Sequence, residues 1–184
     1  LDESVDAVIS VNARRYGKGI MTRRFDKMSR LAFTEGKSII LINQVGGSGD
    51  IVYDGTSGIL NREGHLVMLL KSFEEDMQIY DTEAKNEPFE VPFTTYNDRT
   101  RLIYSAACLG LRDYFLKNGY EKACVGLSGG IDSAVVACLA VGALGKENVR
   151  VLLMPSPFTP NESVEDAKAL AENLGVEYSV LPII

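Results

Sequence analysis

Two serines, two glycines and an aspartate stand together in one short segment, Ser128-Gly129-Gly130-Ile131-Asp132-Ser133. The apolar run Ala123-Cys124-Val125 before it predicts a buried strand, and residues 134–140 after it predict a buried helix. Glycines between a strand and a helix let the backbone approach an anion, and the first N–H groups of the helix point toward that anion. The predicted phosphate-binding loop comprises Gly126, Leu127, Ser128, Gly129, Gly130, Ile131, Asp132 and Ser133.

This loop differs from two common phosphate-binding motifs. It lacks the Gly-Lys-Ser/Thr ending of a Walker A loop, and its glycines do not have the Gly-x-Gly-x-x-Gly spacing of dinucleotide-binding folds. A carboxylate next to a triphosphate would repel it unless a divalent cation lay between them, and Mg²⁺ binds one or two carboxylates together with phosphate oxygens. We therefore predict that Asp132 is a Mg²⁺ ligand; the alternative is that it only caps the following helix.

Composition narrows the classes of protein. With 46% hydrophobic and 24% charged residues, the chain of 184 residues is predicted to be globular, and its net charge of −6 argues against general nucleic-acid binding. Its apolar runs are shorter than the roughly 18–20 residues of a transmembrane helix, so no membrane partner is expected. Cys108, Cys124 and Cys138 lie in apolar contexts without metal-ligand spacing, which predicts buried, reduced thiols in a cytoplasmic protein.

The second half of the chain has an alternating rhythm of strands and helices. A helix is predicted over 97–117, strands over 123–127, 149–154 and 176–180, and helices from Ser133 to Leu144 and from a capping box at Ser163–Asp166. Strands joined through helices predict a parallel, doubly wound sheet that binds its ligand at the carboxyl ends of the strands. The phosphate loop and the pair Leu153 and Met154 both follow such strand ends.

The phosphate loop resembles the Ser-Gly-Gly-x-Asp-Ser signature of the PP-loop ATP pyrophosphatases, which have an adenine nucleotide alpha hydrolase-like fold. Three further motifs are similar to those of the glutamine-dependent NAD⁺ synthetases: residues 110–115, Leu153-Met154-Pro155-Ser156 and residues 169–175. The resemblance implies that the loop holds the β,γ-diphosphate of ATP with Mg²⁺. It also implies that the backbone of Leu153 and Met154 contacts adenosine; the alternative is that these two residues only end a core strand.

The first half is predicted to be α/β as well. We expect a buried strand over 5–11, a helix from Ile20 that ends at Gly36, and strands over 38–43, 51–53, 58–60, 65–70 and 73–80, with a flexible loop at 46–50. Leu41-Ile42-Asn43-Gln44-Val45-Gly46-Gly47 and Asp54-Gly55-Thr56-Ser57 resemble the later part of a nitrilase-type amidohydrolase, an α/β sandwich. The expected organisation is the C-terminal part of a nitrilase-like glutaminase domain at 1–85, a linker at 86–98, and the N-terminal part of a PP-loop synthetase domain at 99–184.

No catalytic residue is predicted within this chain. The resemblance implies a glutaminase site of a Glu, a Lys and a nucleophilic Cys that lie upstream of Leu1, and we expect missing sequence at both ends of the chain. A Ser-Pro turn that helps to hold glutamine is expected after Ala13, but the sequence has Arg14-Arg15-Tyr16-Gly17-Lys18. Either the protein diverges here or a segment between the flanks is absent, so no glutamine ligand is assigned.

The resemblance implies ATP-dependent amidation of deamido-NAD⁺ to NAD⁺ through an adenylate intermediate, with ammonia from glutamine hydrolysis and a homo-oligomeric enzyme in the cytoplasm. One alternative is another PP-loop amidotransferase, of the GMP or asparagine synthetase type, although those enzymes carry different glutaminase folds. The other alternative is a non-catalytic ATP-binding module, which would bind ATP without releasing pyrophosphate.

Overall fold

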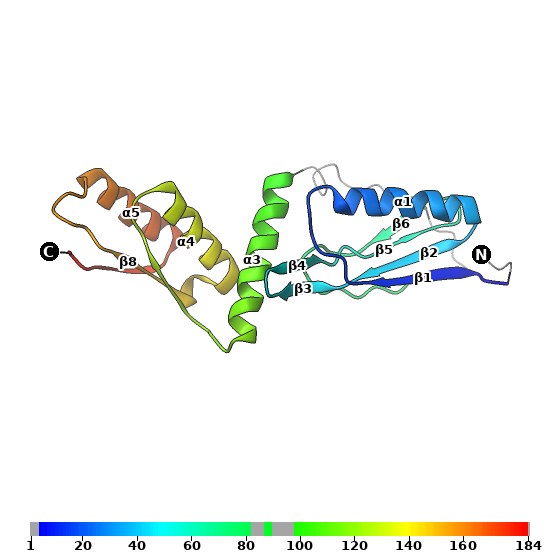
Figure 1. The fold of residues 1–184 in the computed structure, drawn as a ribbon, viewed down its shortest axis with the longest axis horizontal. Helices are drawn as coiled ribbons and strands as arrows, with labels where there is room; N and C mark the ends of the chain where they lie inside the picture. Colours follow the sequence, from blue (N-terminus) through cyan, green and yellow to red (C-terminus); the bar gives the residue numbers. More distant parts are fainter. Residues whose placement is uncertain (1–3, 82–86, 90–97, 184) are drawn as a thin grey trace. The chain divides into compact units, whose positions relative to one another are not determined.

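The computed structural model describes residues 4–81, 87–89 and 98–183, which divide into two compact units, residues 1–106 and 107–184 (Figure 1). The boundary falls inside helix α3 (Arg99–Lys117), and most of the predicted linker lies outside the described residues. Among the described helices, none is both long and apolar enough to cross a membrane.

The first unit is a mixed sheet with one helix packed on it. Its strands β1 (Ala7–Asn12), β2 (Ser38–Asn43), β5 (Gly58–Leu60) and β6 (Leu66–Leu69) lie in that order, with β1 parallel to β2 and the other pairs antiparallel. Helix α1 (Ile20–Glu35) connects β1 to β2 and covers one face (Figure 1). The core beneath it is formed by Ala32, Ile39 and Leu60, with Val8, Phe25, Met28 and Leu66 around them.

The prediction for α1 is confirmed, including its end. Gly36 has a φ of 61°, and the backbone N–H of Lys37 donates to the carbonyl of Ala32 at 3.2 Å. A residue in the left-handed conformation is the usual way to terminate a helix and satisfy its last carbonyls. The basic residues of this helix are exposed, as expected for a solvated face, with one exception, Arg24, which is buried.

Three predictions for the first unit are wrong. The strand at β1 is not buried: Ile9 and Val11 are 64% and 74% exposed, because β1 is the edge of its sheet and α1 covers only one face. The expected flexible loop at 46–50 is instead a hairpin, in which β3 (Val45–Ser48) pairs antiparallel with β4 (Ile51–Asp54). Glycine at 46, 47 and 49 suggested flexibility, whereas Gly49 supplies the positive φ of the tight turn and Gly46 pairs with Tyr53 inside β3.

The third wrong prediction is the strand at 73–80. Phe73 has a φ of 63°, which is incompatible with a strand. The Asp76 carboxylate then accepts hydrogen bonds from the backbone N–H groups of Lys71 and Met77, at 3.1 and 2.9 Å, so the chain turns back on itself. A carboxylate that binds nearby backbone donors offers an alternative to strand pairing.

The second unit is a three-stranded parallel sheet with β7 (Ala123–Gly126), β8 (Val149–Leu153) and β9 (Glu177–Val180) in that order. Helix α4 (Ile131–Leu144) and the short helix η1 (Lys146–Asn148) connect β7 to β8, and α5 (Asn161–Leu174) connects β8 to β9. The core is formed by Leu127, Ala137, Ala140, Val149, Val151, Leu153, Ala167, Ala171 and Val176.

Both helices lie on the same face of this sheet (Figure 1), where Val149, Val151 and Leu153 of β8 point into the core. The mixed α/β architecture and the parallel strands agree with the prediction. The doubly wound arrangement requires helices on both faces, which these two helices do not supply, so it stays a prediction.

Three local predictions in the second unit are wrong. The helix over 134–140 is not buried throughout, because Val135 and Val136 of α4 are about half exposed. Ser163 does not cap α5, because the helix begins at Asn161 and places Ser163 inside its first turn. The three cysteines are free, but none is buried, and Cys124 is exposed because β7 is an edge strand with one covered face.

Candidate functional site

The phosphate loop leaves β7 at the edge of the sheet where β8 also ends. Gly126 lies opposite Leu152 in the parallel register, and the backbone N–H of Leu127 donates to the carbonyl of Leu152 at 2.9 Å. A Cβ added at Gly126 would lie 3.3 Å from the Cε of Met154. The structure therefore brings together the two groups that sequence motifs suggested, the loop and the Leu153–Met154 strand end.

Gly129 and Gly130 differ in what they require. Gly129 has a φ of 82°, and a Cβ there would overlap the backbone carbonyl of Ser163 in the first turn of α5. Gly130 has an ordinary φ of −85° and is the N-cap of α4. The loop therefore needs glycine most strictly at Gly129, where both the backbone conformation and the neighbouring helix exclude a side chain.

A small network of hydroxyl groups closes the loop. The Ser133 hydroxyl donates to the Gly130 carbonyl at 2.9 Å and accepts from the Ser128 N–H at 3.1 Å. The two hydroxyl oxygens of Ser128 and Ser133 are 2.9 Å apart, and the Gly130 N–H donates to Ser128 Oγ at 3.3 Å. The first N–H groups of α4 have no carbonyl within the helix to bind, so they are available to an anion.

Asp132 lies in the first turn of α4 and is exposed. Gly130 is the N-cap and no side chain caps the helix, so the structure does not support the interpretation of Asp132 as a cap. No group of three or more His, Cys, Asp or Glu residues able to hold a metal occurs in the described parts of the chain. One exposed carboxylate beside a phosphate loop still suits Mg²⁺, because this ion is usually held by one or two carboxylates together with phosphate oxygens.

A cavity of about 110 Å³ opens beside the loop, and two of its lining residues were not predicted as site residues. Pro155 and Thr159 line it together with Ser128 and Met154. Thr159 is held in place by a tight turn in which its hydroxyl accepts from the Ser156 N–H at 2.9 Å. The Ser-x-x-Thr spacing after a strand is the signal that could have identified this turn.

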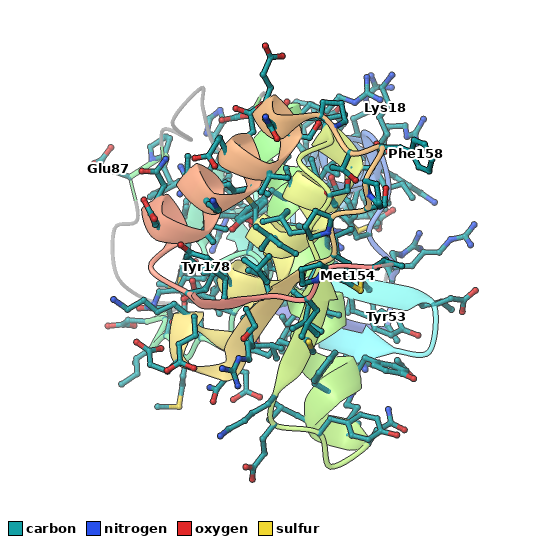
Figure 2. All side chains as sticks on the ribbon, turned by 90° about the vertical axis from the view of Figure 1, so that its left-hand side faces the viewer. Lys18, Tyr53, Glu87, Met154, Phe158 and Tyr178 are labelled. Atoms are coloured by element: carbon teal, nitrogen blue, oxygen red, sulfur yellow. The ribbon has the colours of Figure 1, made fainter. Side chains whose placement is uncertain are left out.

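The two residues proposed near adenosine are not equivalent. The Leu153 side chain is in the core, and its carbonyl already accepts from the Leu181 N–H at 2.8 Å. Met154 is half exposed and lies on the surface that faces the viewer in Figure 2. Of the two, Met154 is more available to a ligand.

A second polar cluster, in the first unit, was not predicted. Arg24 forms an ion pair with Asp54, with 3.6 Å between Nη1 and Oδ1, and its Nη2 donates to the carbonyls of Gly55 and Thr56. Asn43 donates to Asp54 Oδ1 at 2.9 Å. All of these side chains are buried, and burial raises the pKa of Asp54 above its ordinary value, although the Arg24 charge opposes this shift.

The first unit also contains a cavity of about 480 Å³ on its sheet, lined by residues of β2, β5 and the segment 70–78. None of the predicted site residues lines it. The chain has no cysteine before Cys108, so the first unit carries no candidate for the nucleophile of an amidase.

Comparison with known proteins gives a consistent result. Residues 103–184 match the NAD synthase family model. The glutamine-dependent NAD(+) synthetase of Synechocystis is 38% identical over 185 residues, which cover all of this chain and 33% of the relative. The enzyme of the same name from Thermotoga maritima is 35% identical, over all of this chain and 38% of its own length.

A solved structure agrees with these relatives. The glutamine-dependent NAD⁺ synthetase of Acinetobacter baumannii, in complex with adenosine diphosphate, superposes with a TM-score of 0.82 at 34% identity, over 97% of this chain and 34% of that protein. The chain therefore spans about a third of the length of the synthetases it matches. Over its whole length the chain is similar to a segment of the glutamine-dependent NAD⁺ synthetases, and its residues 103–184 match the NAD synthase family model.

Proposed function

We propose that the chain takes part in the ATP-dependent amidation of deamido-NAD⁺ to NAD⁺, with ammonia that comes from glutamine hydrolysis. The observation that carries the proposal is the match over the whole chain to glutamine-dependent NAD⁺ synthetases, together with a Ser-Gly-Gly-Ile-Asp-Ser loop at the carboxyl end of a parallel strand. The ADP in the related Acinetobacter structure supports an adenine nucleotide as ligand.

In the proposed reaction, the nicotinate carboxylate attacks the α-phosphorus of ATP, forming an adenylate and releasing pyrophosphate. Ammonia then displaces AMP to give the amide. The chain contributes a fixed cradle for the leaving pyrophosphate, built from the loop Gly126–Ser133 and the first N–H groups of α4. Donors that are already oriented stabilise charge as it develops without having to reorganise. Mg²⁺, held by Asp132 and phosphate oxygens, would neutralise part of that charge.

We propose that the first unit is the C-terminal part of a nitrilase-like glutaminase domain, with boundaries at 1–85 for this domain, 86–98 for the linker and 99–184 for the synthetase. Its mixed sheet with a helix on one face is compatible with one half of an α/β sandwich. The homo-oligomeric state, the cytoplasmic location and the contact of Met154 and Leu153 with adenosine belong to the same proposal.

A chimeric enzyme tests this function. Residues 1–184 would replace the matching third of the Synechocystis synthetase, and NAD⁺ formation from deamido-NAD⁺, ATP and glutamine would be measured together with pyrophosphate release. We expect both activities in the chimera and neither when it carries Asp132→Ala. The same chimera with Asp166→Ala, which alters an exposed carboxylate on α5, serves as the control and should stay active.

Two outcomes would contradict the proposal. Unchanged pyrophosphate release in the Asp132→Ala chimera would remove Asp132 from the reaction. ATP binding without pyrophosphate release, in a chimera whose other segments are folded, would instead favour a non-catalytic nucleotide module.

A further inference from the structure

The two serines of the phosphate loop have different hydrogen-bonding roles, which follow from counting their hydrogens. A carbonyl oxygen can only accept, so the 2.9 Å contact between Ser133 Oγ and the Gly130 carbonyl uses the Ser133 hydrogen. The 2.9 Å contact between the two hydroxyl oxygens must then use the Ser128 hydrogen. Both hydroxyl hydrogens are therefore engaged inside the loop.

The bonds of Ser133 tie backbone to backbone. Its hydroxyl binds the N–H of Ser128 on one side of the Gly-Gly turn and the carbonyl of Gly130 on the other. The same carbonyl accepts the first helical bond of α4, from the N–H of Ala134 at 3.1 Å. If Ser133 turned toward a ligand, the Ser128 N–H would lose its acceptor and the turn would lose its connection to the helix.

Ser128 has weaker bonds and more freedom. It is exposed, its hydroxyl hydrogen is bound only to Ser133 Oγ, and it accepts a long bond of 3.3 Å from the Gly130 N–H. Rotation of its side chain would free that N–H for a ligand and leave both backbone bonds of Ser133 intact. A bond from a hydroxyl to a phosphate oxygen is charge-assisted, and therefore stronger than the neutral bond that it replaces.

We propose that Ser133 is a positioning residue that holds the loop in its anion-binding shape, whereas Ser128 is the hydroxyl that leaves Ser133 and donates to a phosphate oxygen. This inference rests on the proposed function in one respect, which is that the ligand is the diphosphate of ATP. Ser133 acts on the ligand through the backbone that it orders. Substitutions at the two serines should therefore be coupled, since the Ser128 hydroxyl is useful only in a correctly shaped loop.

The test uses Mg²⁺–pyrophosphate as the probe and isothermal titration calorimetry on the whole chain. We expect Ser128→Ala to weaken binding by about 3–10-fold, the range for one lost hydrogen bond. Ser133→Ala alone should weaken binding more than Ser128→Ala alone. The double variant should bind about as weakly as Ser133→Ala alone, because contacting residues are not additive. If the two losses multiply in the double variant, both serines act as independent ligands and the proposal is overturned.

A matched pair of variants isolates the hydroxyl from the shape of the side chain. Ser133→Thr keeps the hydroxyl and Ser133→Val has nearly the same shape without it. We expect Thr to bind the probe within about 3-fold of the unaltered chain and Val to bind as weakly as Ala. Equal binding by the Thr and Val variants would overturn the role of the hydroxyl, and circular dichroism would establish that both are folded.

Amide hydrogen exchange in the absence of ligand separates this inference from the proposed function. The Ser128 amide should exchange at least about 10-fold faster in Ser133→Val than in Ser133→Thr, since only Thr keeps its acceptor. Equal exchange rates would refute the positioning role, whether or not the probe binds. The unaltered chain could fail to bind Mg²⁺–pyrophosphate while the Ser128 amide still exchanges at unequal rates in the two variants. That result would refute the proposed function and the ligand role of Ser128 but support the positioning role of Ser133.

Discussion

Each unit of the chain has a polar cluster with one aspartate, and the two aspartates have opposite surroundings. In the first unit, Arg24, Asp54 and Asn43 are buried, and Asp54 is bound to both of the others. In the second unit, Asp132 is exposed at the start of α4, and in the described part of the chain neither a cap nor an ion pair engages it.

The difference indicates which aspartate serves the fold and which serves a ligand. A buried carboxylate must find its partners inside the protein, since an unpaired buried charge is strongly destabilising. An exposed carboxylate at a helix N-terminus keeps its oxygens free, and the helix dipole favours its charge.

Asp54→Ala should destabilise the chain by about 3–5 kcal/mol, because it leaves the buried Arg24 guanidinium and the Asn43 amide without the oxygen that they contact. Urea denaturation followed by circular dichroism measures the loss. Asp50→Ala, in the exposed turn between β3 and β4, is the matched control and should change stability by less than about 0.5 kcal/mol. Equal effects at the two positions would remove the structural role of the buried pair.

Gly129→Ala should be the most damaging change within the phosphate loop. Both its φ of 82° and the nearby Ser163 carbonyl oppose a side chain, and strain in this backbone region alone costs about 1–3 kcal/mol. Gly119→Ala is a close control, because Gly119 has a φ of 74° with no atom within 4 Å of the added Cβ. Loss of Mg²⁺–pyrophosphate binding and a larger loss of stability are expected only at Gly129; equal stability losses would show that Ser163 does not constrain the loop.

Asp132→Ala should separate binding from stability. Loss of a favourable charge near the helix dipole costs only about 0.3–1 kcal/mol, so the chain stays folded. Affinity for Mg²⁺–ATP should fall by at least about 10-fold, as expected when a metal site loses a supporting group. Calorimetric titration of the unaltered chain, Asp132→Ala and the control Asp166→Ala measures the affinity. A fall in stability as large as that of Asp54→Ala would contradict the assignment of Asp132 to the ligand.

Two carboxylates of the described residues, Asp54 and Asp76, should have pKa values on opposite sides of the ordinary value of about 3.9. Burial raises the pKa of Asp54, so its contribution to stability is greatest below the unfolded pKa and is lost as the pH rises through the folded pKa. Hydrogen bonds from backbone N–H groups, that of Lys71 first, lower the pKa of Asp76, so its contribution is present above the unfolded pKa and lost as the pH falls through the folded pKa. Carboxyl NMR titration measures both, and a reversed order would contradict the hydrogen bonds at Asp76 or the burial of Asp54.

Local sequence patterns predicted the helices whose apolar residues recur at regular spacing. The apolar spacing predicted both α1 and α5, and these helices place Ala32, Ala167 and Ala171 in the cores. The same patterns could not show that β1 and β7 are edge strands, because exposure there depends on which strands are neighbours. Ile9 and Cys124 therefore appeared buried from the sequence.

Features that depend on distant residues were also beyond a local pattern. The motif identified the phosphate loop and suggested that it lies near Met154. It did not indicate that Ser163 fills the space behind Gly129, or that Thr159 lines the neighbouring cavity. The partners of Asp54 are Arg24 of α1 and Asn43 of β2, which are distant in the sequence, so no local pattern indicated the ion pair.

The packing of α5 against Gly129 has a consequence for the evolution of the connection between β8 and α5. Surface connections usually tolerate insertions, and Phe158 within this one is 94% exposed, with its side chain pointing away from the ribbon in Figure 2. Its length, however, determines where Ser163 meets the loop. Substitutions at Phe158 should therefore accumulate freely, whereas an added or deleted residue between Pro155 and Asn161 would be selected against, because it would displace a phosphate loop some thirty positions earlier in the chain.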